Sequence, residues 1–408
     1  MLKLRAKSFI SLIVISTLFT CIDPYVPKLK GYDSLLVVDG LITDENTSYS
    51  IRLSRTFQQQ DASPDMISDA TVFISDDLGT EFDLKSTGNG IYKSDSTIFR
   101  GSAGKTYVLH AVTSDGELYE SDPCLMQPVP EIDSIYFKKD QDLANNKTEA
   151  LDGIRIYLDS QGSDNNFYYR WDFEEIWRFR VPIPRSHVFI DETNIPMIAD
   201  VREYCWKTGK SNDIIIHEIY PGEPRRIENE PIYFIATAKS DRLLVEYSIM
   251  IKQYSLSKNE YDFWNNLKQI NEAGGDIFAK QPFTVISNIH SLKNPEERVL
   301  GYFQVSAVKQ RRKNISFNEI ANLNLPYFNY NCEKIEYAPW DSPWNNFKPP
   351  MTWYDLWYMY TSSGYYFVEP KYDPATHDLV KLVFAKPECA DCEVTGTLKE
   401  PDFPPGSK

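Results

Sequence analysis

Short runs of β-branched and aromatic residues, each closed by a turn signal, recur through the first third of the chain and constrain its fold more than any other feature. Such runs favour strands, because these side chains suit the pleated, half-buried surface of a sheet. Asp76–Gly79 and Ser114–Glu117 lie between runs and combine acidic residues with glycine, as tight hairpin turns require. The runs are residues 35–43, 48–57, 70–75, 90–94 and 105–112. They predict a small β-sandwich of immunoglobulin or transthyretin type over residues 34–128.

The longer part that follows, residues 129–397, is also rich in strand-like runs but contains one clear helix signal. Ser257 and Glu260 have the spacing of a capping box, and apolar residues then fall on one helical face until a pair of glycines ends the pattern. The pattern predicts a helix over 257–272 that packs on a sheet. We therefore expect a mostly β protein, in which the sandwich precedes a larger β-rich domain with one packed helix. Residues 398–408 form a C-terminal tail.

The N-terminus has the layout of an export signal. Three basic residues precede an apolar run over residues 9–18, which is too short to span a bilayer. The run ends near Cys21, in the pattern of a bacterial lipoprotein leader. We predict a signal peptide over 1–20, lipidation at Cys21 and a tether over 21–33, so that the protein would be attached to a membrane by its lipid. The alternative is an ordinary secretory signal that leaves Cys21 for a disulfide.

Charge excludes one class of partner. The chain has 58 acidic and 43 basic residues, giving a formal net charge of −15. A chain this acidic repels phosphate backbones, so we expect no nucleic acid partner.

Cysteine positions predict cross-links and not chemistry. Cys205, Cys332, Cys389 and Cys392 are expected to form two disulfides, with three possible pairings, because an exported protein meets oxidising conditions. Cys124 is then the odd thiol and is expected to be buried. The C-x-x-C spacing at the end lacks a βαβ context for redox chemistry and lacks a second pair or a histidine cluster for zinc.

Catalytic motifs are absent from the sequence. It contains no G-x-S-x-G elbow, no phosphate-binding loop and no H-E-x-x-H, and its five histidines are scattered. Glu174 and Glu175 are adjacent in a predicted strand and therefore point to opposite faces, so they cannot serve as an acid–base pair. They are expected to balance nearby arginines across strands. We predict that the protein is not an enzyme and has no metal and no cofactor.

Two further segments allow a functional interpretation beside a simpler one. Residues 159–166 carry acidic and amide side chains that would suit calcium, but a hairpin turn between strands accounts for them better. Residues 308–313 form the one compact basic run. A charged strand edge that discourages pairing explains this run, although contact with an acidic receptor loop is a second interpretation.

Aromatic residues concentrate between residues 327 and 372, among prolines, asparagines and aspartates. Aromatic rings suit cores, interfaces and ligand platforms alike, because they bury large areas while their polar tips find partners. Three interpretations remain open: packing within the second domain, contact with a receptor, or stacking against a glycan or peptide. The candidate surface residues are Trp340, Trp344, Trp353 and Trp357.

Several stretches resemble a known family. The runs QYSLSKNEYDFWNNLKQINEAGGDIF (253–278) and SNIHSLKNPEERVLGYFQVSAV (287–308) are similar to the signature of a Bacteroidetes lipoprotein family catalogued as domain of unknown function 4249. The ending ECADCEVTGTLKEPDFPP (388–405) and the opening LLVVDGLIT (35–43) fit the same family.

The resemblance implies an outer-membrane lipoprotein encoded beside a TonB-dependent receptor, with no established enzymatic activity. The expected role is an accessory subunit that associates with this receptor β-barrel and assists nutrient uptake or complex stability. We expect a lipid-anchored position in the outer membrane, with the cell surface favoured over the periplasmic face. The alternative is a surface protein that captures a glycan or peptide directly through the aromatic segment.

Overall fold

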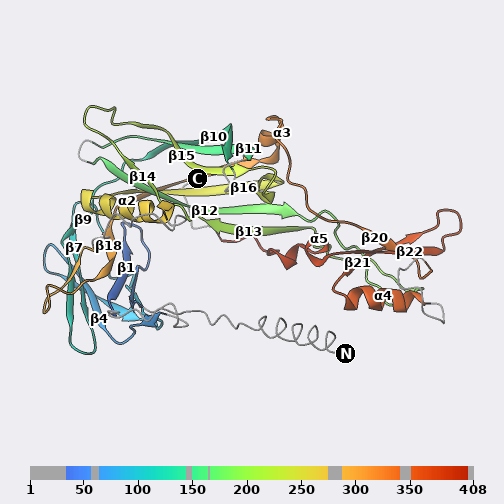
Figure 1. Cartoon of the computed structure of the whole chain (residues 1–408), viewed down its shortest axis with the longest axis horizontal. Coiled ribbons are helices and arrows are strands. Elements are labelled where there is room, and N and C mark those ends of the chain that lie inside the picture. Colours follow the sequence, from blue (N-terminus) through green and yellow to red (C-terminus); the bar gives the residue numbers. More distant parts are fainter. Residues whose placement is uncertain are drawn as a thin grey trace, which may run out of the picture.

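The computed structural model describes residues 34–56, 64–143, 149–163, 166–273, 287–340 and 351–402. The predicted leader, Cys21 and the tether lie outside these residues, as does Trp344. Within the described ranges the chain is built mainly of strands, which confirms the predicted fold class. Three parts follow one another along the long axis (Figure 1), and we call them the N-terminal domain, the central sandwich and the distal module.

The N-terminal domain is one continuous path of strands that encloses an apolar core. Its strands are β1 (Leu36–Ile42), β2 (Ser50–Arg55), β3 (Asp65–Met66), β4 (Thr71–Asp76), β5 (Glu81–Ser86), β6 (Ile91–Lys93), β7 (Thr106–Val112), β8 (Leu118–Ser121) and β9 (Cys124–Leu125). Alternate side chains of β1 and β7 are buried, as the sequence alternation predicts. Gly79 and Gly116 adopt φ of 78° and 86° at the two predicted turns. This arrangement is consistent with a sandwich.

Two strands from far along the chain complete this domain. Strand β17 (Ile289–Ser291) pairs with β8, and β18 (Leu300–Val305) pairs in parallel with β1. The predicted range 34–128 leaves both strands out, because a pairing between distant segments has no local sequence signal. Gly301 makes the parallel pairing possible, since at its φ of 85° a β-carbon would lie 1.9 Å from the Val38 carbonyl oxygen.

The central sandwich packs two sheets against each other around a shared apolar core. One sheet has the order β10 (Ile132–Leu143), β11 (Ala150–Ser160), β15 (Ile227–Ala236). The other has the order β13 (Tyr204–Lys210), β12 (Tyr168–Arg180), β16 (Glu246–Ser255), β19 (Val308–Ser316), with β14 (Ile215–Glu218) also paired to β12. A 3₁₀ turn, η1 (Asp241–Leu243), precedes β16, and α3 (Phe317–Ala321) follows β19. Fully buried Trp171 and Phe179 of β12 anchor the core.

Helix α2 (Lys258–Ala273) joins the central sandwich to the N-terminal domain (Figure 1). Its start confirms the predicted capping box, since the Ser257 hydroxyl accepts a hydrogen bond from the Glu260 amide and the Glu260 carboxylate accepts one from the Ser257 amide. Phe263 is buried with its ring centroid 4.7 Å from that of Tyr302 in β18. The apolar face of the helix therefore lies against a sheet, as predicted.

The distal module extends from the far end of the central sandwich, opposite the N-terminal domain (Figure 1). It consists of residues 182–203, 332–340 and 351–390. Its elements are β20 (Ile335–Tyr337), α4 (Trp353–Ser362), β21 (Tyr366–Tyr372), β22 (Leu379–Ala385) and α5 (Pro387–Ala390), and η2 (Cys392–Val394) follows it. The three strands form one small sheet in the order β20, β22, β21. Among the described residues, no helix is both long and apolar enough to cross a membrane.

Candidate functional site

Helix α4 arranges the aromatic residues of the distal module into three stripes. The Thr352 hydroxyl accepts a hydrogen bond from the Asp355 amide, and the Asp355 carboxylate accepts one from the Thr352 amide at 2.9 Å, which closes a capping box. This backbone hydrogen bond holds the pKa of Asp355 below its usual value. Because residues four apart lie on one face, Leu356 and Tyr360 are buried together against the sheet.

The second stripe, Trp353 and Trp357, is half-buried. The Trp357 ring stacks on Phe189, with centroids 5.6 Å apart and planes 20° from parallel. The Trp353 ring meets Trp340 edge-on at 6.0 Å. Such ring pairs add stability beyond the area that they bury, so these two tryptophans help to hold the module together.

The third stripe faces outward. Tyr354 and Tyr358 are 51% and 58% exposed, and their rings stack at 6.3 Å. Trp340, before the helix, is 63% exposed. We call these three residues the aromatic surface. Other large apolar side chains exposed on the same module are Val188, Ile190, Met197, Val201 and Tyr372. Exposure of aromatic rings to water is energetically unfavourable, and a concentration of exposed rings is typical of a binding surface.

The four candidate tryptophans thus have different surroundings. Trp340 is exposed, Trp353 and Trp357 are partly packed, and Trp344 lies outside the described residues. The sequence did not single out the tyrosines of the outward stripe, although the T-x-x-D spacing at Thr352 was a helix-start signal that could have identified them.

Two disulfides hold the base of the module. Cys332 pairs with Cys389, and Cys205 pairs with Cys392. These are the four cysteines that the sequence assigns to two bridges. Cys205 is a core residue of β13, so its bridge ties the segment after α5 to the central sandwich. The remaining thiol, Cys124, is free and partly buried, and burial raises its pKa to about 12. Such a thiol is unreactive at neutral pH.

Residues 182–203, for which the sequence predicts no separate role, supply part of the module. Phe189 enters the aromatic core, and the backbone amide of Ile183 donates to the carbonyl of Cys389 at 3.0 Å. The segment is a long connection between β12 and β13, and its short apolar run gave only a weak sequence signal.

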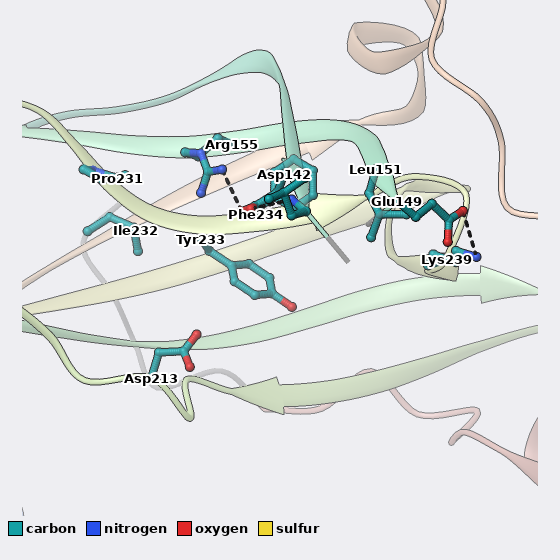
Figure 2. Close-up of a pocket in the computed structure, with 11 residues that line it drawn as sticks. Asp142, Glu149, Leu151, Arg155, Asp213, Pro231, Ile232, Tyr233, Phe234 and Lys239 are labelled. Carbon is teal, nitrogen blue, oxygen red and sulfur yellow. Dashed lines mark hydrogen bonds and ion pairs between the residues drawn. The ribbon is translucent and has the colours of Figure 1, made fainter. Parts of the chain in front are cut away.

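A separate cavity of about 820 Å³ lies along β15, the edge strand of its sheet in the central sandwich (Figure 2). Most charged side chains that line this cavity form ion pairs with one another. The Arg155 guanidinium donates to Asp142 at 2.8 Å, and Lys239 lies 3.8 Å from Glu149. Burial raises the pKa of Tyr233, whose ring forms one wall. The cavity has room for a ligand but shows no convergent set of acid, base and nucleophile.

The expectation for Glu174 and Glu175 needs a correction. The two residues do point to opposite faces, but Glu175 is paired with Arg242 of η1, which donates from Nη2 at 2.6 Å, and not with an arginine of its own strand. Arg178 instead lies over the Tyr204 ring, and Arg180 pairs with Glu203. A buried carboxylate needs a partner that strand spacing alone does not reveal.

The basic run is also engaged within the fold. Lys309 pairs with Glu131, the Arg311 guanidinium donates to the Ile132 carbonyl, and Lys313 pairs with Glu319. These contacts join β19 to the neighbouring sheet and to α3. They favour the structural interpretation of residues 308–313 over a receptor contact.

Metal and catalytic groupings do not emerge in the part of the chain that the structure describes. No three His, Cys, Asp or Glu side chains there are placed to hold an ion. His110, His217 and His290 each contact one carboxylate, that of Glu120, Glu230 and Asp122, respectively. The hydrogen bond to Glu230 raises the pKa of His217.

Comparisons with known proteins place the chain in a family. No curated protein matches it. The family model described as "Domain of unknown function (DUF4249)" matches residues 22–312, which include the N-terminal domain and all strands of the central sandwich except the end of β19. The helix and strand of the distal module that carry most of the aromatic residues lie beyond the match. The chain therefore belongs to the family of the domain of unknown function DUF4249.

Proposed function

We propose that the protein is a lipid-anchored accessory subunit of the outer membrane. In this proposal it docks on a TonB-dependent receptor through the aromatic surface and assists nutrient uptake or complex stability. The observation that carries the proposal is the exposure of Trp340, Tyr354 and Tyr358 on a module that disulfides and stacked rings hold in shape. Trp and Tyr are enriched at the energetic centres of protein interfaces.

Pre-organisation strengthens this argument. The stacked pair Tyr354–Tyr358 stands on a capped helix whose inner face is buried, so little side-chain freedom remains to be lost on binding. A partner that covers these rings removes apolar area from water without reshaping the module.

The attachment point also fits. Cys21 precedes β1 by a short tether, and β1 belongs to the N-terminal domain at the end of the molecule opposite the distal module (Figure 1). Lipidation at Cys21 would thus leave the aromatic surface accessible to a membrane partner, with the cell surface as the favoured side.

The test is a mild-detergent pull-down of the tagged protein from its native outer membrane, with mass spectrometry of the co-purifying chains and of the N-terminal peptide. We expect an acylated Cys21 and a stoichiometric β-barrel receptor. The triple variant Trp340→Ala, Tyr354→Ala, Tyr358→Ala should still carry the lipid, but the amount of receptor that co-purifies with it should fall at least about tenfold.

A matched control replaces two exposed apolar side chains at the other end, Leu78→Ala and Ile98→Ala, and should retain the receptor. Equal recovery of the receptor with the triple variant would contradict the docking surface, and an unacylated N-terminus would contradict the anchor.

A second candidate function rests on the stacked tyrosines. The Tyr354–Tyr358 pair offers a flat exposed platform of the kind on which a sugar ring or peptide could stack. Direct capture of a glycan or peptide predicts binding by the isolated chain, whereas a docking subunit needs its receptor.

A further inference from the structure

A charged cavity of about 370 Å³ lies on the face of the central sandwich opposite its core, bordered by α2 and the loop after β13. Alternate residues of β12 supply its floor, because Arg170, Asp172 and Glu174 point away from the face that carries Trp171. Pairing places Lys252 of β16 opposite Asp172 and Lys210 of β13 opposite Glu174. We call this space the Arg170 cavity.

Charge in the Arg170 cavity is balanced. Six charged side chains line it, three cationic and three anionic: Arg170, Lys210, Lys252, Asp172, Glu174 and Asp213. The aromatic rings of Tyr254 and Trp264 complete the wall. A volume of this size is in the lower part of the roughly 300–1,000 Å³ typical of small-molecule sites, and the combination of apolar wall and convergent polar groups is typical of them too.

Arg170 is held by aromatic rings while few of its donors are used. Its guanidinium lies 4.4 Å from the Tyr254 ring centroid and 4.6 Å from that of Trp264. The Trp264 indole N–H donates to Gln304 at 3.1 Å, which fixes that ring. A guanidinium has five N–H donors, and the ion pair that Arg170 makes with a described residue is a single contact of 3.5 Å with Asp172.

The other charged groups of the cavity are also loosely matched to one another. Lys252 lies 3.5 Å from Glu45 of the N-terminal domain, and the Tyr254 hydroxyl donates to Asp172 at 3.3 Å. Neither Lys210 nor Glu174 forms a side-chain ion pair with any residue in the described ranges.

Two buried charge pairs near the core of the central sandwich are tighter. Lys207 meets Asp241 at 2.7 Å, and Arg242 meets Glu175 at 2.6 Å with two further contacts near 3 Å. In these two pairs the opposite charges meet closely, whereas Arg170 keeps a buried Nε without a hydrogen-bond partner and meets Asp172 only at 3.5 Å. A ligand that supplies the missing partners would account for the difference.

We propose that the Arg170 cavity binds a small zwitterion, namely an α-amino acid or a short peptide with both termini charged. The carboxylate would be held by Arg170 and Lys210, and the ammonium group by Asp172 and Glu174. A ligand of one sign would satisfy three of the six groups and leave the other three facing a like charge or none, which disfavours simple anions and simple amines. The site is independent of the aromatic surface, which lies on another part of the molecule.

The experiment is calorimetric titration of the full mature chain with a panel of α-amino acids and dipeptides. At least one member should bind, and the comparison of free amino acids with dipeptides distinguishes the two sources of the zwitterion. Capping the best binder by N-acetylation or by C-terminal amidation should weaken it at least about tenfold in each case, because each cap removes one charged contact.

Two variants at the rim keep the test independent of folding. Neither side chain belongs to an apolar core, so Lys210→Gln and Glu174→Gln should both fold. Each should lower the affinity for the best binder about tenfold. Lys239→Gln changes a charge in the neighbouring cavity of Figure 2 and should leave the affinity unchanged.

The proposal fails if no zwitterion in the panel binds, or if a capped analogue binds as well as its parent. It also fails if Lys210→Gln and Glu174→Gln both bind as wild type does. Binding of inorganic phosphate without any zwitterion would identify an anion site instead and would likewise overturn it.

Discussion

Glu260 joins helix α2 to the N-terminal domain through its carboxylate. One oxygen accepts a hydrogen bond from the Ser257 amide at 2.7 Å, and the other accepts one from the Val305 amide of β18 at 2.9 Å. The side chain is buried, and burial raises its pKa to about 7. The sequence pattern identifies Glu260 as part of a capping box. The same carboxylate also links α2 to the N-terminal domain, which the local pattern could not show.

Stability should fall as pH rises through about 7, because of Glu260. The folded protein holds a proton on this carboxyl between about pH 4.5 and 7, where the unfolded chain has released it, so folding binds the proton. The contribution is complete below pH 4.5 and is lost above pH 7. Its upper limit is on the order of 3 kcal/mol, because each pKa unit corresponds to about 1.4 kcal/mol.

Urea unfolding of wild type and of Glu260→Gln at pH 6 and pH 8 measures this effect. The wild-type free energy of unfolding should drop more between the two pH values than that of the variant, which has no charge to titrate. Equal drops would show that Glu260 does not titrate in this range.

At the scale of elements, local signals predicted those elements whose residues are neighbours in sequence. Helix α2 and the strands β1, β4 and β7 follow from capping, periodicity and turn residues. Helix α4 was missed, because aromatic residues occupy all its faces and have modest helix propensity, so no apolar stripe stood out. The place of strand β18 beside β1 depends on a contact between distant segments, which no local signal shows.

The Cys332–Cys389 bridge should stabilise the distal module more than it stabilises the rest of the protein. It links two residues that are 57 positions apart in the sequence, and α4 and the small sheet lie between them. Loss of such a bridge typically costs about 2–4 kcal/mol. The variant Cys332→Ser with Cys389→Ser should show faster hydrogen exchange in β21 and β22 while the central sandwich keeps its protection. Cys124→Ser, which affects no bridge, is the control. Unchanged exchange in the module would contradict this role.

At the scale of the whole molecule, the sequence predicted a mostly β chain, and the described residues form three parts along it. The distal module combines residues 182–203 with residues 332–340 and 351–390, so no continuous stretch carries its signature. Aromatic composition pointed to the correct region, but which rings are buried and which are exposed depends on packing against Phe189 and β22. Composition therefore indicated the region of the candidate surface but not which of its rings are exposed.

The most direct test of the proposed docking is photo-crosslinking in the native outer membrane, with p-benzoylphenylalanine in place of Tyr354 or Tyr358. The same probe in place of Leu78, which is exposed on the N-terminal domain, is the control. We predict a crosslink from the two tyrosine positions to a TonB-dependent β-barrel receptor, and none to that receptor from position 78. Absence of a receptor crosslink from both tyrosine positions, or an equal one from position 78, would contradict the account.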